Sequence, residues 1–177
     1  MISKLKSLFN PLERPEEKSL EDFELYYLDS RDFVRASIYW MVRDQNIDDL
    51  VQETYLRAWN NFKGFQDRST FRTWIYRIAM NVTFDFFNKS KKAKSLDSLN
   101  EPVAHEINIE LEDLITKAVL EMNPKQREAF NLFYKFGYTT EEIADLTDSK
   151  LGTVKSRLHH AKEIFSNYIK EDEARNG

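Results

Sequence analysis

Apolar residues recur at intervals of three or four positions along most of this chain, the spacing that places side chains on one face of a helix. The predicted helices cover residues 20–29, 31–43, 46–62, 71–89, 110–122, 124–136, 139–146 and 152–169. The 177 residues include only four glycines and four prolines, which argues against turn-rich β-sandwiches and glycine-rich nucleotide-binding folds. The pattern predicts an all-α protein.

The predicted helix at about 71–89, which Ser69 or Thr70 would cap, has two faces of different character. One face is an apolar stripe that we expect to be buried: Phe71, Trp74, Ile75, Ile78, Val82 and Phe86. The other face is mostly polar: Thr73, Arg77, Asn81, Phe84 and Asn88. An amide at Asn81 could recognise a base edge, although by spacing alone a solvated asparagine is the commoner outcome.

Turn and capping residues divide the chain into two small helical domains. The sequence between them is polar and lacks an apolar period, which predicts a flexible linker. In the second domain, Asn123 with Gln126 and Thr139 with Glu142 form capping boxes, and Gly137 provides a left-handed helix stop. The expected organisation is an N-terminal extension over 1–18, a first domain over 19–94, a linker over 95–109, a second domain over 110–170 and an acidic tail over 171–177.

Charge is distributed unevenly along the chain, whose formal net charge is −4. Residues 63–94 carry +6 and residues 124–170 carry +2, whereas residues 95–123 between them carry −6. The two basic segments are therefore candidates for nucleic-acid contact, although the acidic total argues against it. Cysteine is absent, which excludes disulfides and thiolate sites, and no apolar run is long enough for a signal peptide or a membrane span. A cytoplasmic protein without membrane insertion is expected.

Two helices joined by a short turn, over about 139–158, have the pattern of a helix-turn-helix. The outer face of the second helix carries groups that can reach phosphates and base edges: Thr153, Lys155, Ser156, Arg157, His159, His160 and Lys162. The alternative is an ordinary helical hairpin with a solvated charged face. His159 and His160 point about 100° apart on a helix, so the pair predicts no metal site.

Aromatic and basic residues alternate over residues 62–94, a composition that suits single-stranded nucleic acid because unstacked bases pack on flat rings. Helical spacing places Phe71, Trp74 and Phe86 inward, as part of the core. The candidates for an exposed stacking platform are three other rings: Phe65, Tyr76 and Phe84.

An acidic first turn at Asp48 and Asp49 opens the helix that ends near Phe62. Such a turn is either a solvated helix start or a face that docks a basic partner, and spacing alone does not decide between them. The chain has no phosphate-binding glycine loop, His-Glu-x-x-His motif or nucleophile elbow. No catalytic residue, metal site or cofactor is therefore predicted.

Two blocks of the sequence carry motifs of a known protein family. Residues 48–59, DDLVQETYLRAW, and 69–81, STFRTWIYRIAMN, resemble the second conserved region of the sigma-70 family of RNA polymerase sigma factors. Residues 126–130, QREAF, 140–144, TEEIA, and 152–161, GTVKSRLHHA, resemble its fourth region. Only a linker lies between the blocks, a layout similar to that of the small extracytoplasmic-function (ECF, group 4) sigma factors.

The resemblance implies three sets of contacts. The helix of residues 48–59 would dock on the clamp helices of the β′ subunit of polymerase through Asp48, Asp49, Leu50, Gln52, Glu53 and Leu56. The loop from Gly64 to Thr70 and the helix after it would open the −10 promoter element and hold a flipped-out base through Phe65, Arg68, Ser69, Arg72, Thr73, Arg77 and Asn81. The helix-turn-helix would recognise the −35 element in the major groove through Thr153, Lys155, Ser156, Arg157, His159 and His160.

The turn of the helix-turn-helix departs from the family pattern. Asp148 and Ser149 stand where a glycine and an apolar residue are usual. Aspartate tolerates a left-handed backbone, so the turn can close, but an apolar anchor is lost. Lys150 stands where serine or threonine often caps the recognition helix, so we expect a less firmly held helix start.

The resemblance implies a non-enzymatic specificity subunit of bacterial RNA polymerase. Its partners would be the core enzyme, through the β′ clamp helices and the β flap, and promoter DNA, with which it would enter the nucleoid. An anti-sigma factor that masks either domain is a further expectation of the family. Two alternatives stay open at this point: an autonomous helix-turn-helix regulator that binds operators without polymerase, and a helical protein-interaction adaptor.

Overall fold

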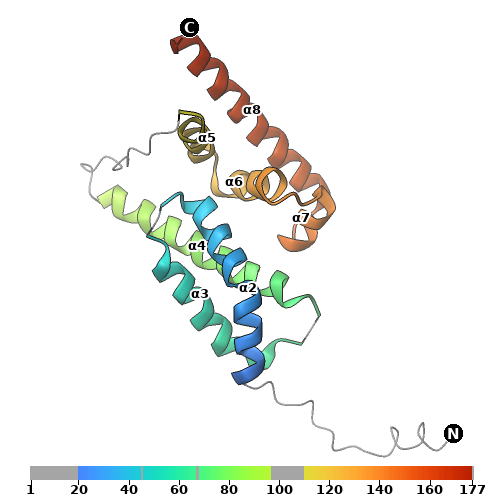
Figure 1. Ribbon diagram of the computed structural model, residues 1–177. Coiled ribbons are helices and arrows are strands. Elements are labelled where there is room, and N and C mark those ends of the chain that lie inside the picture. The colour runs from blue at the N-terminus through green and yellow to red at the C-terminus, as the bar shows by residue number, and fades with distance from the viewer. Residues whose placement is uncertain (1–19, 45, 67, 97–109, 177) are drawn as a thin grey trace, which may run out of the picture.

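The computed structural model describes residues 20–44, 46–66, 68–96 and 110–176, and these residues form helices and turns but no strand. The elements of the first domain are α2 (Leu20–Val42), α3 (Asp48–Asn61), the 3₁₀ turn η1 (Phe62–Gly64) and α4 (Phe71–Leu96) (Figure 1). Those of the second domain are α5 (Glu110–Glu121), α6 (Pro124–Phe130), the π-helical turn η2 (Asn131–Lys135), α7 (Thr140–Leu146) and α8 (Leu151–Asn176). The all-α prediction is confirmed for these residues. The N-terminal extension and residues 97–109 of the linker lie outside them.

One predicted helix boundary is wrong, because α2 is a single helix where two were expected on either side of residue 30. Ser30 is buried within it, and its hydroxyl donates to the Tyr26 carbonyl oxygen at 2.7 Å. That bond keeps the serine compatible with a helix, since the side chain uses a carbonyl of the preceding turn. The same oxygen lies 2.9 Å from the Tyr55 hydroxyl, which ties α2 to α3.

The predicted capping residues are confirmed at three helix starts. The Thr70 hydroxyl accepts from the Thr73 amide at 3.2 Å, and complete capping boxes form at Asn123 and Thr139. Gly137 has a φ of 73°, the left-handed conformation that ends the preceding helical segment. The last helix, α8, runs through the expected acidic tail as far as Asn176.

In the first domain, α4 packs across α2 and α3 (Figure 1). Aromatic rings close one end of this bundle: Tyr26 stacks on Phe71 at 4.4 Å between ring centroids, and Phe23 meets Phe62 edge-on at 5.0 Å. The predicted apolar stripe of α4 is buried at Phe71, Ile75 and Val82 and half-buried at Trp74 and Ile78, but Phe86 is 38% exposed. The expectation that Phe86 lies inward is therefore wrong, because α4 extends past the helices that cover its earlier turns.

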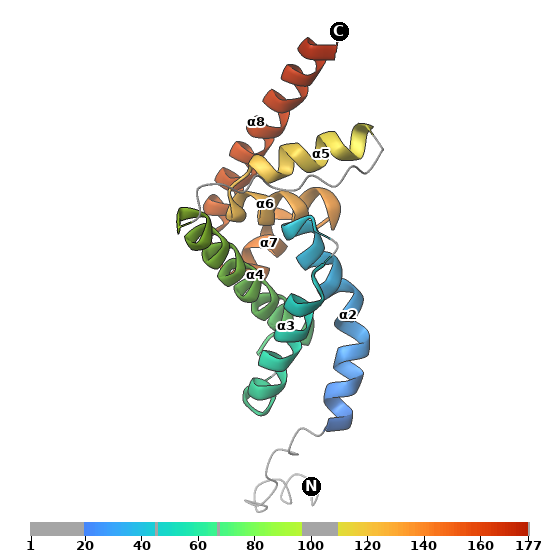
Figure 2. The ribbon, with the colours of Figure 1, turned by 90° about the vertical axis from the view of Figure 1, so that its left-hand side faces the viewer.

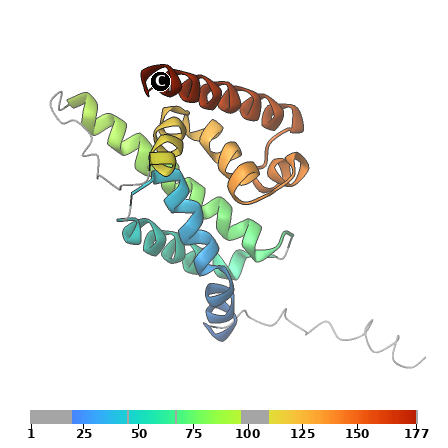
Figure 3. The same ribbon diagram turned by 45° about the horizontal axis from the view of Figure 1, so that its top comes forward.

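The second domain lies directly against the first, on α2 and α4 (Figures 2 and 3). The ring of Phe33 on α2 meets that of Phe136 edge-on at 5.8 Å between centroids. As a result one buried core continues through both domains, with members Val34, Ile38, Ile75 and Tyr76 in the first and Leu132, Ile143, Leu146 and Val154 in the second. A smaller cluster is made by Val119, Met122, Phe130 and Ala161.

Candidate nucleic-acid and protein interfaces

An exposed groove lies between α2 and α3. Two large apolar side chains of α3 are exposed there, Leu56 at 50% and Trp59 at 43%. The groove has a volume of about 560 Å³, and Asp48 and Gln52 also line it. Exposed apolar groups beside carboxylates are typical of a protein-binding surface. We call Asp48, Asp49, Gln52, Leu56 and Trp59 the α3 face.

The acidic residues predicted on α3 do not all have the same surroundings. Asp48 pairs with Arg35 of α2, whereas Asp49 is exposed and has no ion-pair partner among the described residues. Glu53 accepts from Arg57 at 2.7 Å, and Arg57 also donates to Asp85 of α4 at 3.0 Å. These two carboxylates raise the pKa of Arg57. Arg57 therefore links α3 to α4 while Glu53 holds its guanidinium, and Leu50 is half-buried beneath the face.

The polar side of α4 is exposed as predicted at Arg77 and Asn81, and Arg72, which the resemblance implied as a DNA contact, is also exposed. Thr73 is partly buried and its hydroxyl lies 3.0 Å from that of Thr70 at the helix start, and Arg68 is exposed in the loop before it. The guanidinium of Arg72 lies 4.0 Å from the centroid of the Phe33 ring. Arg68 and Arg72 lie beside the start of α4, whereas Arg77 and Asn81 lie further along the helix and on another of its faces.

The expected stacking platform is wrong at two of its three rings. Phe65 is 5% exposed and lies against Trp74 at 5.0 Å between ring centroids, and Tyr76 is also buried. The loop before α4 folds inward here, so the Phe65 ring completes the aromatic cluster instead of facing solvent. Phe84 is half-buried, and the Lys125 ammonium of the second domain lies 3.9 Å from its ring centroid.

Arg77 uses its guanidinium on the second domain. Its Nη2 donates to the Asp145 carbonyl oxygen at 2.6 Å and its Nε donates to the Leu146 carbonyl oxygen at 3.2 Å. Both carbonyls belong to the last turn of α7, where the negative end of the helix dipole attracts a cation. Arg77, which the resemblance assigned to contact with the −10 strand, is thus hydrogen-bonded to the helix-turn-helix.

The helix-turn-helix closes through the left-handed residue that the sequence predicted. Asp148 has a φ of 50°, and the Ser149 amide donates to the Ala144 carbonyl oxygen at 2.9 Å. Arg157, one of the candidate base-contacting residues, donates from Nη1 to the Ser149 hydroxyl at 3.0 Å. Arg157 is therefore half-buried and holds the turn, a role that its position on the outer helix face did not indicate.

The remaining candidate residues of α8 form an exposed row. This row consists of Thr153, Lys155, Ser156, His159 and His160. The two histidine rings lie near one carboxylate, with His159 Nε2 at 3.5 Å and His160 Nδ1 at 3.2 Å from Glu163 oxygens. Within the described residues, no group of three or more histidines and carboxylates could hold a metal ion. A helix with these side chains on one face suits the major groove.

A buried polar group lies between the domains, and no pattern in the sequence predicted it. Glu128 of α6 is 2% exposed, and its carboxylate accepts from Lys125 at 3.0 Å and from the Tyr76 hydroxyl at 3.4 Å. Burial raises the pKa of Glu128, and the Lys125 ammonium opposes that rise.

Among the described helices, none combines the length and the apolar composition that a membrane-spanning helix needs.

Comparisons with known proteins agree with this architecture. Residues 27–93 match the family model of Sigma-70 region 2, and residues 112–164 match that of Sigma-70 region 4. The chain is 26% identical over 175 residues to the ECF RNA polymerase sigma-E factor of Haemophilus influenzae, covering 89% of this chain and 93% of that protein. It is 28% identical over 141 residues to ECF RNA polymerase sigma factor SigW of Bacillus subtilis, covering 70% and 75%.

Solved structures show the same fold. The sigma factor RpoE, crystallised with the anti-sigma factor NepR from Bartonella quintana, superposes with a TM-score of 0.69 at 24% identity. The match covers 85% of this chain and 98% of that one. CnrH, in complex with the cytosolic domain of CnrY, gives a TM-score of 0.64 at 19% identity and covers 87% and 91%.

The order of the two regions decides among the hypotheses that the sequence left open. An autonomous regulator or an adaptor would need only one of the two domains, whereas region 2 followed by region 4 spans most of this chain. The protein therefore belongs to the sigma-70 family as an ECF RNA polymerase sigma factor, a non-catalytic protein that directs transcription initiation.

Proposed function

We propose that the α3 face is the surface that docks on the β′ clamp helices of core polymerase. The observation that carries this proposal is the pair of exposed side chains, Leu56 and Trp59, in a groove that Asp48 also lines, with Asp49 exposed on the same helix. Apolar groups supply most of the binding free energy of such an interface, and the carboxylates select a basic partner. Asp48 and Glu53 have a second role, because each already pairs with an arginine of the same domain.

We propose that promoter DNA is contacted by two surfaces. The loop of residues 64–70 with Arg72, Arg77 and Asn81 of α4 would hold the opened −10 element, and the exposed row of α8 would enter the major groove at the −35 element. The basic side chains in each set support this assignment, because phosphate neutralisation supplies much of the affinity for DNA. Base capture on the first domain, without nucleotide hydrolysis, would stabilise strand opening.

An anti-sigma factor is proposed as the regulator of this protein. RpoE and CnrH, whose folds are similar, were each crystallised with a partner, NepR and the cytosolic domain of CnrY. An accessible groove with an apolar lining, the α3 face, is available to such a partner. We place the protein in the cytoplasm, where core polymerase and promoter DNA are found.

Run-off transcription with purified bacterial core polymerase and a promoter library tests these assignments. The full chain should redirect initiation to a discrete set of promoters, and the charge reversal Asp49→Lys should abolish that redirection. Asp29→Lys, an exposed position on α2 away from the α3 face, is the matched control and should be active. Full activity of the Asp49→Lys protein would remove the proposed docking surface.

A further inference from the structure

A cavity with apolar walls is lined by residues of α2, α5, α6, η2 and α8. Its volume is about 530 Å³, within the range of sites that bind small organic molecules. The walls include six aromatic and aliphatic side chains: Trp40, Ile115, Val119, Phe130, Tyr134 and Phe165. Four of these six side chains are aromatic rings, so the cavity suits a flat apolar group.

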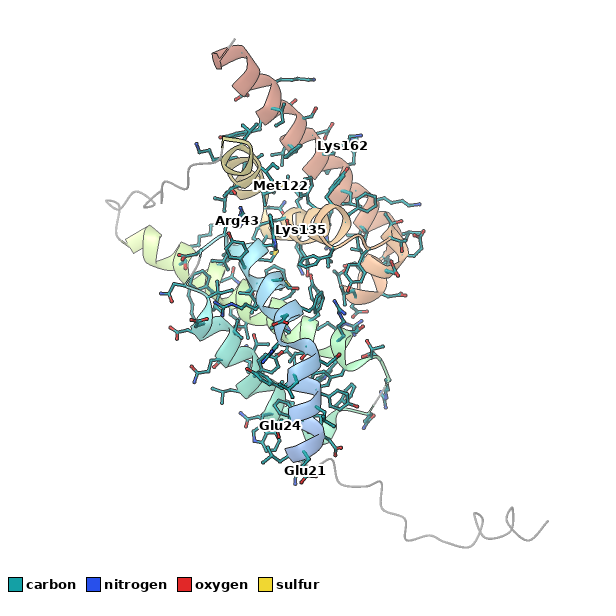
Figure 4. All side chains as sticks on the ribbon, in the orientation of Figure 1. Glu21, Glu24, Arg43, Met122, Lys135 and Lys162 are labelled. Carbon is teal, nitrogen blue, oxygen red and sulfur yellow. The ribbon has the colours of Figure 1, made fainter. Side chains whose placement is uncertain are left out.

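Three cationic side chains also line this cavity. Arg43 follows the end of α2, Lys135 belongs to η2 and Lys162 to α8, and the described residues that line the cavity include no carboxylate. Figure 4 shows Arg43 and Lys135 close to each other, with Lys162 above them on α8. Among the described residues, no ion pair joins any of the three to a carboxylate. Their positive charge can therefore attract an anion.

Two of these charges lie near the ring of Trp40. Arg43 Cζ is 4.2 Å from the centroid of that ring, and Lys135 Nζ is 4.3 Å from it. Each cation is attracted by the ring, but the two like charges repel each other. Because a bound anion would offset that repulsion, this side of the cavity favours a negatively charged group.

Arg43 also has a donor without an acceptor. Its Nη2 donates to the Thr116 hydroxyl, but its Nε is buried and has no hydrogen-bond partner in the part of the chain that the structure describes. A buried N–H without an acceptor is destabilising. A carboxylate bound beside Arg43 would supply the acceptor, and it would accept a charge-assisted hydrogen bond, which is stronger than a neutral one.

We propose that this cavity binds a small aromatic carboxylate. The aromatic walls would enclose the flat apolar body of the ligand, and the three cations would hold its carboxylate. Such a site joins the two requirements for a specific small ligand, an apolar enclosure and a few polar groups that fix its orientation. The proposal goes beyond the function proposed above, because it depends neither on the α3 face nor on the promoter contacts.

Isothermal titration calorimetry of the full chain with 2-naphthoate tests the binding. This probe has two fused rings and one carboxylate, and it should bind with a dissociation constant of roughly 10–100 µM, as expected for a ligand of its size. The neutral 2-naphthamide has the same rings, and acetate has the charge without the rings. Each should bind at least about tenfold more weakly than 2-naphthoate. Decanoate, an aliphatic carboxylate, should also bind more weakly, because it lacks a flat body.

The tryptophan side chains report where the ligand binds. The chain has three tryptophans, Trp40, Trp59 and Trp74, of which only Trp40 lines this cavity. In NMR spectra of the protein labelled with ¹⁵N, 2-naphthoate should move the indole N–H signal of Trp40 and leave the other two unchanged. Trp40→Phe identifies that signal by its loss. A shift confined to Trp59 would place the ligand in the groove between α2 and α3 and would overturn the proposal.

Charge removal tests the cations one at a time. Lys135→Gln and Lys162→Gln should each weaken the binding of 2-naphthoate by about fivefold, and Arg43→Gln by about tenfold because it also removes the buried Nε donor. Lys170→Gln, at a position that is exposed on α8 like Lys162 but does not line the cavity, is the matched control and should leave the affinity unchanged. Circular dichroism checks that the variants are folded. If Arg43→Gln unfolds, the two lysine variants decide, because their side chains are exposed.

The proposal fails if 2-naphthoate does not bind at about 1 mM, or if 2-naphthamide binds equally well. Equal weakening by Lys162→Gln and Lys170→Gln would also overturn it, because the anion would then be attracted by the basic surface in general. Decanoate that binds as tightly as 2-naphthoate would overturn the assignment to a flat ligand. A second copy of the chain is the alternative occupant, and a dimer in sedimentation experiments that Tyr134→Ala dissociates would replace the ligand by that copy.

Discussion

The Ser149 hydroxyl accepts a hydrogen bond from Arg157 Nη1 at 3.0 Å, across the turn between α7 and α8. The serine hydroxyl lies 3.3 Å from the Thr147 carbonyl oxygen, to which it donates. The turn is thus fixed by a polar chain from Thr147 through Ser149 to Arg157. A hydrogen-bonded serine stands where the family usually has an apolar anchor, and it orients an arginine on the recognition helix.

Ser149→Ala should destabilise the second domain by about 1 kcal/mol, because it removes the acceptor that holds the Arg157 guanidinium. Urea unfolding of the full chain, followed by circular dichroism, measures this loss. Ser156→Ala, an exposed position on α8, should change stability by less than about 0.5 kcal/mol. Equal effects of the two alanines would show that the Ser149–Arg157 bond contributes nothing to the turn.

Two glycines of the second domain should respond oppositely to alanine. Gly137 has a φ of 73°, so Gly137→Ala should cost about 1 kcal/mol in the free energy of unfolding. Gly152 lies in the first turn of α8 with open space around a would-be Cβ, so Gly152→Ala should stabilise the chain by about 0.5–1 kcal/mol. Thermal or urea unfolding of both variants tests this, and a shift of the same sign in both would contradict the argument from backbone conformation.

How far the sequence could predict this fold is clearest at its caps and turns. Thr139 with Glu142, and the left-handed Asp148, are local features, and each formed as expected because its partners lie within a few residues. The break expected near Ser30 did not form, because tertiary contact with Tyr55 favours one continuous helix. Helix caps can therefore be predicted from nearby residues. Whether a helix continues through a weak break depends on contacts with distant elements, which the local sequence does not show.

The candidate interfaces were less accessible to sequence reasoning for the same reason. The resemblance implies Asp49 and Leu56 as docking residues, and both are exposed on α3, but Trp59, which is exposed on the same helix, was not included. Phe65 was expected at the surface because it precedes a helix in a polar loop, and only the packing of that loop on Trp74 buries it. The hydrogen bond from Arg77 to the Asp145 carbonyl oxygen joins residues 68 positions apart, and residue spacing along the sequence does not predict it.

Glu128→Gln should alter how stability depends on pH. Burial raises the folded-state pKa of Glu128 above its ordinary value of 4.5, so the folded chain holds this proton more tightly than the unfolded chain. Its stabilising contribution is present below pH 4.5 and is lost as pH rises through the raised pKa. Glutamine keeps the uncharged state, so the variant should gain stability relative to the parent as pH rises.

Urea unfolding at pH 4.5 and at pH 7 measures that difference. Glu121→Gln, an exposed position on α5, is the control and should show no such change. A Glu128→Gln protein that is less stable than the parent at pH 7, with no relative gain from pH 4.5, would mean that the Lys125 ion pair outweighs the cost of burying the carboxylate.

Docking on polymerase should depend on the apolar side chains of α3 as well as on charge. Leu56→Ala should weaken binding to core polymerase by about tenfold, which corresponds to the loss of 1.4 kcal/mol typical of an interface side chain of this size. Leu25→Ala, an exposed leucine on α2 outside the groove, provides the matched comparison. Titration of labelled core enzyme gives both dissociation constants, and equal constants would place the interface elsewhere.

Lys155→Ala should weaken −35 recognition through the loss of a phosphate contact. Lys155 is exposed on the outer row of α8, and a lysine acts there as a point charge and not as a base-specific group. The affinity of the holoenzyme for promoter DNA should fall for every sequence alike, and the slope of log affinity against log salt should decrease by about one. Lys117→Ala, exposed on α5 and away from α8's outer row, should leave the slope unchanged. A loss confined to one promoter sequence, with the salt slope preserved, would mean that Lys155 contacts a base instead.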